Sequence, residues 1–391
     1  MSKIKELQLG MLSKKWLQTN EIIIYGFGVI ARKCVDILME DFSIPYIIDN
    51  APEKSGTCYN GIPVITQQEA LNRGICCPIV IAGTIGVYQN ISDMLIKEGL
   101  VEYKDFCLLD LFAAEWYWHN KRQVHLVEVH TTVTTKCTLK CRNCNMFMPY
   151  FKEHMVNDLS IFKKDMDLLF RMADRIFSIG ILGGEPLLNK DLADMILYLQ
   201  ENYGKRIGEI SIITNGTILP DKRLIDVFRN CKVQVHISDY TSIVPYHSKL
   251  KHFESILLEN HIKYRINSSL VWCDFGFPEN CFNISDVRSH MMECFPVFRG
   301  INDSKLYFCH VAWGAEKCGL YQLNNNDYYN LENVDIKDDL EKERFLNYSL
   351  GGKQDWSLSF CKICGGCGAD NTNYVPAGRQ MKEDCTNEGH I

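Results

Sequence analysis

The chain has 391 residues, of which 46% are hydrophobic and 23% are charged, and its formal net charge is −6 at pH 7. This composition suits a globular protein with two or three cores, and it excludes disordered, collagenous and coiled-coil chains. The negative net charge gives no general attraction to nucleic acid, so we expect no nucleic-acid partner. No apolar run approaches the roughly 20 residues of a membrane span, and Lys and Glu interrupt residues 2–18, so we expect a cytoplasmic protein without a membrane partner.

Strands and helices alternate through the first 115 residues. The patterns predict helices at 2–18, 29–39, 66–73 and 86–98, and strands at 21–25, 45–48, 61–65 and 78–82. This alternation indicates a Rossmann-like, doubly wound parallel sheet over residues 1–115. We expect residues 116–123 to form a linker or an interdomain contact.

The turn after the first strand carries a possible nucleotide-binding pattern. Gly26, Gly28 and Ala31 match G-x-G-x-x-A between a strand and a helix, and Asp49 ends the next strand. This is the dinucleotide fingerprint in its required context, so a nucleotide or nucleotide-sugar could bind at Gly26, Gly28 and Asp49. The same turn can serve only to pack the helix on the strand, and both alternatives stay open.

A second α/β series follows. Strands are predicted at 125–130, 176–182, 208–214, 232–238 and 262–267, and helices at 160–174, 190–203, 221–229 and 247–260. We expect residues 120–290 to form a central partial (β/α)6 TIM barrel. Beyond residue 285 the alternation ends, and residues 291–391 are expected to form a C-terminal cysteine-rich auxiliary cluster domain.

Three cysteines lie close together after the first strand of the second series. Cys137, Cys141 and Cys144 form C-x3-C-x2-C in a loop at the carboxyl end of that strand, which in β/α barrels is the active face. In a reducing compartment, clustered cysteines are metal ligands or catalytic groups before they are disulfides. Three thiolates leave one iron of a four-iron cluster open for chemistry. A zinc site is the alternative, but it needs a fourth ligand that the loop does not provide.

This spacing resembles that of the radical S-adenosylmethionine (SAM) superfamily, and Gly183-Gly184-Glu185-Pro186 after the next strand resembles its GGEP motif. The resemblance implies a [4Fe–4S] cluster on the three cysteines, SAM at the open iron, and a flavodoxin- or ferredoxin-type electron donor. It implies that Gly183, Gly184, Glu185 and Pro186 hold the SAM ammonium, and that Asn215 and Ser238 contact its ribose or carboxylate. Asn143 departs from the usual aromatic residue, so the adenine contact is open between Phe147 and Tyr150.

A second set of cysteines follows the barrel. Cys294 and Cys309 flank a predicted hairpin with its turn at 300–304, and Cys361, Cys364 and Cys367 form C-x2-C-x2-C. The pattern is similar to a twitch domain, which implies one auxiliary [4Fe–4S] cluster on Cys294, Cys309, Cys361 and Cys364. A SPASM domain with two clusters is the alternative, although Ser304 replaces its glycine. The roles of Cys318, Cys367 and Cys385 stay open, and we expect Arg379 and Gln380 to cover the auxiliary cluster.

The resemblance implies hydrogen abstraction from a small molecule, and we favour a sugar, polyol or nucleotide-sugar in a cell-surface polysaccharide pathway. Oxidation is favoured because an auxiliary cluster could accept an electron. Epimerisation is the alternative and needs a free thiol at the barrel mouth, for which Cys273 is the candidate hydrogen donor. The substrate could instead be a peptide, as in peptide-modifying radical SAM enzymes, or the chain could be a non-enzymatic iron–sulfur or zinc protein.

Overall fold

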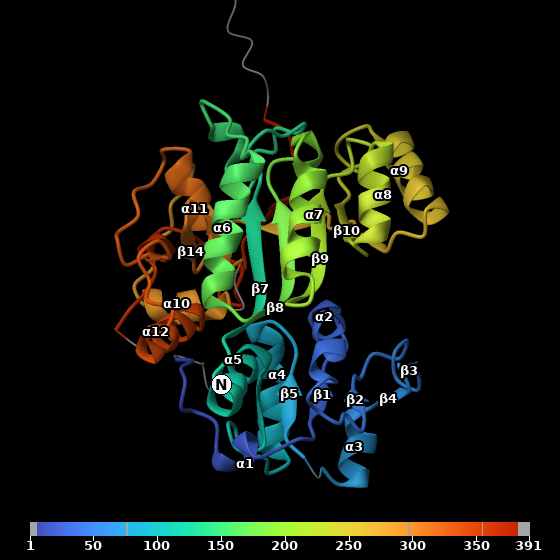
Figure 1. The fold of residues 1–391 in the computed structure, drawn as a ribbon, viewed down its shortest axis with the longest axis vertical. Helices are drawn as coiled ribbons and strands as arrows, with labels where there is room; N and C mark the ends of the chain where they lie inside the picture. The colour runs from blue at the N-terminus through green and yellow to red at the C-terminus, as the bar shows by residue number, and fades with distance from the viewer. Residues whose placement is uncertain (1–5, 76, 296–297, 354, 382–391) are drawn as a thin grey trace, which may run out of the picture.

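The computed structural model describes residues 6–75, 77–295, 298–353 and 355–381, and it contains two largely parallel sheets, one above the other in Figure 1. The lower sheet has the order β3-β4-β2-β1-β5-β6, with β1 (Ile23–Tyr25), β2 (Ile47–Ile48), β3 (Cys58–Tyr59), β4 (Ile62–Ile65), β5 (Ile79–Ile81) and β6 (Phe106–Leu108). Neighbours from β4 to β6 pair in parallel, whereas β3 is antiparallel to β4. The connecting helices are α2 (Val29–Leu38), α3 (Gln67–Arg73) and α4 (Ile85–Lys97). The predicted α/β alternation with a parallel sheet is confirmed here.

At the edges of this region one prediction is wrong, and one of two alternatives is excluded. Among the described residues of 2–18, only α1 (Lys14–Leu17) is an α-helix. The backbone N–H groups of Met11 and Leu12 donate to the Glu115 carboxylate at 3.1 Å, so a side chain and not a helical carbonyl satisfies them. Residues 116–121 are not a linker, because they belong to α5 (Leu109–Lys121). The Tyr117 ring stacks 3.6 Å from the ring of His125, so α5 is an interdomain contact and crosses the predicted domain boundary.

The upper sheet has the order β11-β10-β9-β8-β7-β13-β14-β15. Its parallel strands are β7 (His125–Thr132), β8 (Arg175–Leu182), β9 (Ile207–Thr214), β10 (Gln234–Ser238) and β11 (Tyr264–Asn267), and the helices α6 (Leu159–Met172), α7 (Leu192–Tyr203), α8 (Lys222–Asn230) and α9 (His247–Glu259) connect them. These helices lie along the sheet in Figure 1. The predicted series is confirmed, but within the described residues the sheet stays open, so closure into a barrel is not observed.

The C-terminal region extends the same sheet. The predicted hairpin is present as β13 (Gly300–Asn302) and β14 (Lys305–Tyr307), followed by β15 (Tyr328–Asn330). Its turn is shorter than the predicted 300–304, because residues 300–302 belong to β13. β13 pairs in parallel with β7 and so adds a further parallel strand that the sequence did not reveal. The helices here are α10 (Val287–Glu293), α11 (His310–Lys317) and α12 (Asp339–Ser349), and a separate ribbon pairs β12 (Val271–Cys273) with β16 (Tyr374–Pro376). Within the described residues, no helix is long and apolar enough to cross a membrane.

Helix α2 of the N-terminal region packs against the amino ends of the upper strands. Lys33 Nζ lies 2.6 Å from Glu128 Oε1 on β7 and 4.0 Å from Glu209 Oε1 on β9. The Ile37 side chain packs directly on Gly208, because a Cβ added to Gly208 would lie only 2.1 Å from Ile37 Cδ1. The N-terminal region therefore covers the end of the sheet opposite to the cysteine loop.

Candidate active site

The loop after β7 places the three cysteine sulfurs among hydrogen-bond donors. Leu139 N donates to Cys137 Sγ at 3.4 Å, and Gln380 Nε2 donates to Cys141 Sγ at 3.3 Å. Backbone N–H groups of the following turn donate to Cys144. Burial raises the pKa of Cys137 to about 12 and that of Cys141 to about 11, so without a metal all three are thiols. Metal binding at these sulfurs therefore releases protons, and the donors then stabilise the resulting thiolates.

The glycines of the GGEP segment bring its backbone onto the cysteine loop. Gly184 N donates to Thr134 O and Glu185 N donates to Lys136 O, both at 2.8 Å. A Cβ on Gly183 would lie 2.3 Å from Thr134 O, and one on Gly184 would lie 2.3 Å from Lys136 O. Neither position can hold a side chain without moving the backbone that leads into Cys137. Both glycines therefore allow the GGEP backbone to lie directly against the cysteine loop. Pro186 follows as the first residue of a 3-10 turn, η2 (Pro186–Leu188).

The Glu185 carboxylate is fully buried and is held entirely by donors of the chain. Thr214 Oγ1 donates to its two oxygens at 2.8 and 2.9 Å, Asn215 N donates at 2.9 Å, and Leu187 N donates at 3.1 Å. Burial raises the pKa of Glu185 to about 7. Within the described part of the chain, no Lys or Arg forms an ion pair with this carboxylate. A cationic group bound beside it would supply the missing counter-charge.

The ends of β9 and β10 complete this side of the site. Asn215 Nδ2 lies 3.6 Å from Cys137 Sγ, and Asn215 O accepts from the Tyr246 hydroxyl at 2.9 Å. The same hydroxyl accepts from Tyr240 N at 2.9 Å, next to Ser238 at the end of β10. The structure therefore brings Cys137, Glu185 and Asn215 together, with Ser238 on the neighbouring strand end. Tyr246 was not among the predicted site residues, since its position in the sequence was typical of packing.

Of the two candidates for the adenine contact, Phe147 is buried against aromatic rings. Its ring centroid lies 5.5 Å from that of Phe277 and 6.3 Å from that of Phe360. Tyr150 is half-buried, and its hydroxyl lies 3.3 Å from Glu279 Oε1. The environment of Phe147 is that of a core residue, which leaves Tyr150 as the accessible candidate.

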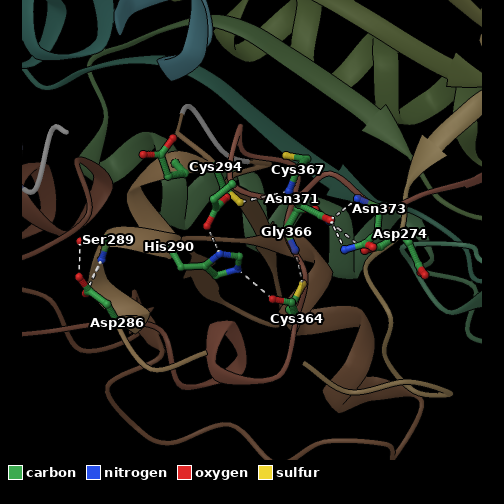
Figure 2. A network of polar contacts seen from close by, with 12 residues as sticks. Asp274, Asp286, Ser289, His290, Cys294, Cys364, Gly366, Cys367, Asn371 and Asn373 are labelled. Carbon is green, nitrogen blue, oxygen red and sulfur yellow. Dashed lines mark hydrogen bonds and ion pairs between the residues drawn. The ribbon is translucent and has the colours of Figure 1, made fainter. Parts of the chain in front are cut away.

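The second cysteine set surrounds a mostly apolar cavity. Its lining includes the four predicted cysteines and one more, namely Cys294, Cys309, Cys361, Cys364 and Cys367. Cys367 N donates to Cys294 Sγ at 3.3 Å, and the Cys367 thiol also donates to this sulfur and holds the pKa of Cys294 below its usual range. Figure 2 shows Cys294, Cys364 and Cys367 grouped around His290. Cys318 lies apart and donates to Ala315 O at 3.3 Å, and Cys385 lies outside the described residues.

A buried histidine adjoins this cavity. His290 Nδ1 lies 2.6 Å from Asp370 Oδ2. His290 Nε2 lies 2.8 Å from Cys364 O, a contact that a dashed line marks in Figure 2. Burial disfavours the charged imidazolium, but the hydrogen bond and charge of Asp370 raise the pKa of His290 above its usual value. Both ring nitrogens face acceptors, an arrangement that suits the protonated ring. A positive charge here favours thiolates at the neighbouring cysteines.

The arrangement of the cysteines bears on the zinc alternative. Among the residues that the structure describes, no three His, Cys, Asp or Glu side chains come together around one metal ion. A structural zinc site needs four ligands, each about 2.3 Å or less from a single ion. Neither cysteine set is therefore arranged as a ready-made single-ion site within the described residues.

Cys273 lies on β12, opposite Tyr374 of β16. It is half-buried, and the thiol groups that influence it electrostatically are those of the second set, Cys294 and Cys367. The preceding Trp272 has its ring 5.4 Å from that of Tyr240, near the first cysteine loop. Because successive side chains of a strand point to opposite faces, Trp272 points toward the first cysteine loop and Cys273 toward the second cysteine set. Cys273 therefore adjoins the auxiliary set.

Gln380 lies on the first cysteine loop, so the expectation that it and Arg379 cover the auxiliary set is wrong. The pairing of β16 with β12 carries the chain back across the sheet end, and residues 379–381 bond to residues 140–142. β12 and β16 are three residues each and about 100 positions apart in the sequence. Nothing in the local sequence pattern could have indicated this contact, nor the place of His290.

The N-terminal turn makes its contacts within the chain. Gly26 has a φ of +92°, and a Cβ there would lie 3.1 Å from Ala82 O. Gly28 directly precedes α2. The Asp49 carboxylate accepts from Phe27 N at 2.7 Å and from Lys54 Nζ at 3.0 Å. The acidic residue that would bind a ribose is thus paired with the glycine turn itself.

Three comparisons with known proteins bear on this site. Residues 131–238 match the family model described as "Radical SAM superfamily". A probable GTP 3′,8-cyclase of Methanocaldococcus jannaschii is 28% identical over 169 residues, which are 42% of this chain and 53% of that protein. An S-adenosylmethionine-dependent nucleotide dehydratase of Selenomonas ruminantium is 31% identical over 100 residues, 25% of this chain and 33% of that protein. The chain thus spans about half or less of the length of these curated relatives.

Solved structures with a similar segment include Streptococcus suis SuiB bound to S-adenosylmethionine, at 15% identity and a TM-score of 0.32, covering 61% of this chain and 72% of that one. BtrN in complex with AdoMet and 2-DOIA is 20% identical with a TM-score of 0.28, covering 36% of this chain and 55% of that one.

Proposed function

Residues 131–238 of this chain form a radical SAM domain, and from this premise we propose that the protein is an oxidising radical enzyme acting on a polar small molecule. In this proposal a [4Fe–4S] cluster held by Cys137, Cys141 and Cys144 would supply the electron that cleaves SAM to methionine and a 5′-deoxyadenosyl radical. The observation that carries the proposal is the placement of two separate cysteine sets on either side of β12. Each set has its own hydrogen-bond donors and its own surroundings.

The GGEP segment would hold the methionyl end of SAM. The Glu185 carboxylate is buried without a Lys or Arg partner among the described residues, and a bound ammonium would favour its ionised form. The same carboxylate fixes the backbone of Asn215, whose side chain reaches Cys137 Sγ. Glu185 would therefore act in two ways, by charge on the ammonium and by holding the end of β9 in place. Asn215 and Ser238, at the neighbouring strand ends, are the proposed contacts for the ribose or carboxylate.

Oxidation is supported by the position of the second cysteine set. An auxiliary [4Fe–4S] cluster held by Cys294, Cys309, Cys361 and Cys364 would accept the electron left on the substrate. The cavity that these residues line also includes Phe298, whose ring lies 5.8 Å from that of His130 on β7. The cavity thus lies one aromatic ring away from the inner face of the sheet. In the balanced reaction, an alcohol loses one hydrogen atom to the 5′-deoxyadenosyl radical, one electron to the auxiliary site and one proton to a base, and gives a carbonyl.

A polar substrate is supported by the side chains on this face of the sheet. His130 lies against Gly180 of β8, and Thr132 and Ser178 share its face because strand side chains alternate. His130 Nδ1, Thr132 Oγ1 and Ser178 Oγ are buried and have no hydrogen-bond partner among the residues that the structure describes. Buried polar atoms of this kind are normally paired. A sugar, polyol or nucleotide-sugar carries hydroxyl groups that would satisfy them, and two of the relatives above are named for reactions of nucleotides.

Two alternatives differ from this proposal in their predicted products. Epimerisation would use Cys273 as hydrogen donor, and the position of this thiol beside Cys294 favours oxidation instead. A peptide substrate, as in peptide-modifying radical SAM enzymes, is the second alternative, and it would give a modified peptide as product. A flavodoxin- or ferredoxin-type protein remains the proposed electron donor.

The N-terminal region has a packing role in this proposal. Asp49 and the Gly26–Gly28 turn bind each other, and α2 inserts Lys33 and Ile37 against the upper sheet. These contacts favour the packing alternative over nucleotide binding at Gly26, Gly28 and Asp49. Equilibrium binding of labelled nucleotides and nucleotide-sugars to the wild type and to Asp49→Ala tests this, because a ligand lost with Asp49→Ala alone would restore the nucleotide site.

The experiment for the proposed reaction is turnover in deuterated water. Protein reconstituted anaerobically with iron and sulfide is incubated with SAM, a reductant and a panel of sugars, polyols and nucleotide-sugars. Oxidation gives a product two hydrogens lighter, and Cys273→Ala has little effect. A product of unchanged composition that carries one solvent deuterium on carbon, and that Cys273→Ala abolishes, would establish epimerisation and contradict the proposal.

A further inference from the structure

Residues 377–381 form a short strap that crosses the first cysteine loop. Arg142 N donates to Arg379 O at 2.8 Å, and Met381 N donates to Lys140 O at 2.7 Å. Between these two bonds, Cys141 and Gln380 face each other as an antiparallel bridge. The strap therefore binds the loop through backbone pairing on both sides of the central cysteine.

The Gln380 side chain donates a hydrogen bond to the Cys141 sulfur. Its Oε1 accepts from Lys140 N at 2.7 Å, while its Nε2 donates to Gly378 O at 2.7 Å and to Cys141 Sγ at 3.3 Å. An amide can be placed either way round, but here one partner is a donor and another is an acceptor. These two partners fix the NH2 group on the side of Cys141. Cys141 Sγ therefore accepts a hydrogen bond from the Gln380 NH2 group and does not face the Gln380 carbonyl oxygen.

The position of the strap does not depend on the cysteine loop alone. Ala377 N donates to Leu270 O at 3.0 Å, beside the pairing of β16 with β12. Gly378 lies against Tyr240 so closely that a Cβ there would be 2.9 Å from the Tyr240 Cβ. The strap is thus anchored to the ribbon and to the end of β10. Gln380 is held at Cys141 by elements that would remain if its side chain were changed.

We propose that Gln380 is a positioning residue that raises the reduction potential of the cluster held by Cys137, Cys141 and Cys144. This inference rests on the proposed function, because it requires a cluster on these three thiolates. One-electron reduction adds negative charge to a cluster and its sulfur ligands. A hydrogen bond donated to Cys141 Sγ stabilises the more negative state, and it does so strongly because Cys141 is buried. Removing the donor therefore makes reduction harder.

Two variants separate the donor from the rest of the side chain. Gln380→Glu keeps an oxygen for Lys140 N but replaces the N–H donor by a carboxylate oxygen, and Gln380→Met removes both interactions without adding charge. Arg379→Ala is the matched control, because Arg379 is the neighbouring strap residue and its side chain is exposed. All four proteins are reconstituted, their iron content is measured, and the SAM-responsive electron paramagnetic resonance signal is followed in a redox titration.

We expect both Gln380 variants to retain iron and to have a lower midpoint potential than the wild type, with Gln380→Glu lower than Gln380→Met. For this one-electron couple, a midpoint potential lower by about 59 mV means a tenfold smaller ratio of reduced to oxidised cluster at a fixed potential. We expect Gln380→Glu to lower the midpoint potential by about this amount. Arg379→Ala should match the wild type. Equal potentials in the wild type and both Gln380 variants would overturn the inference while leaving the proposed function intact. A wild type with no SAM-responsive signal would overturn both.

Discussion

Replacing Glu185 by Gln removes a buried charge while keeping the shape of the side chain. In the metal-free protein, burial raises the pKa of Glu185 from 4.5 to about 7. A carboxyl whose pKa is raised by folding stabilises the native state below its unfolded pKa, and this contribution is lost as the pH rises through the folded pKa. At 1.36 kcal/mol for each pKa unit, the wild type should lose about 3 kcal/mol between pH 4.5 and pH 8 through this group. Glu185→Gln lacks this carboxyl, so its free energy of unfolding has no pH-dependent contribution from this position.

The assay is urea unfolding of the metal-free wild type and Glu185→Gln, followed by tryptophan fluorescence at several pH values. The free energy of unfolding of Glu185→Gln, relative to the wild type, should rise by about 3 kcal/mol from pH 4.5 to pH 8. Glu153→Gln, at an exposed position of the cysteine loop, controls for the loss of one formal charge. A difference between Glu185→Gln and the wild type that stays within about 1 kcal/mol over this range would refute the reasoning.

The same variant tests the proposed role of the carboxylate in SAM binding. A charge-assisted hydrogen bond to an ammonium contributes about 1.5–3 kcal/mol, so Glu185→Gln should weaken SAM binding by roughly tenfold to a hundredfold. Iron content should stay at the wild-type level, because Glu185 is not a proposed cluster ligand. Unchanged SAM affinity in a variant that holds its iron would remove Glu185 from the SAM site.

Three further variants address separate contacts. Gly184→Ala should lower the iron content by at least half, because the new Cβ would lie 2.3 Å from a backbone oxygen of the cysteine loop. Gly86→Ala is the control, since the space around its Cβ is open, and its iron content should match that of the wild type. Lys33→Met should lower the free energy of unfolding by about 3 kcal/mol, since it removes the Lys33 ammonium from Glu128 and leaves the carboxylate beside the His130 ring, 3.4 Å away. Adding Glu128→Gln should recover part of the loss in urea unfolding. Cys273→Ala should leave the iron content unchanged, as judged by iron analysis, because this thiol is outside both proposed ligand sets.

The parts of the site that the sequence predicted are those determined by short segments. Three cysteines within eight positions, and the Gly183–Pro186 segment after the next strand, can be placed on strand ends from hydrophobic pattern alone. Gly183 and Gly184 were assigned to the SAM ammonium, and the structure shows in addition that they lie directly against the backbone before Cys137.

The parts that the sequence did not predict depend on contacts between distant segments. Gln380 reaches Cys141 because a three-residue strand near the C-terminus pairs with β12. Such short strands have no periodicity to detect. Residues 116–123 were expected to form a linker or an interdomain contact, and the sequence did not decide between the two. The structure shows a helix to Lys121, buried between both sheets, whose Trp and Tyr rings fill that space. Both the Gln380–Cys141 contact and the helix at 116–121 are thus determined by packing between segments that are far apart in the sequence.

The most direct test of the account is the formation of 5′-deoxyadenosine from SAM by the anaerobically reconstituted, reduced protein. The wild type should bind roughly eight iron atoms per chain and form 5′-deoxyadenosine and methionine, as measured by iron analysis and chromatography with mass detection. The triple variant Cys137/Cys141/Cys144→Ala should retain about half of the iron and form neither product. A wild type that binds stoichiometric zinc and no iron, or a triple variant that still forms 5′-deoxyadenosine, would contradict the account.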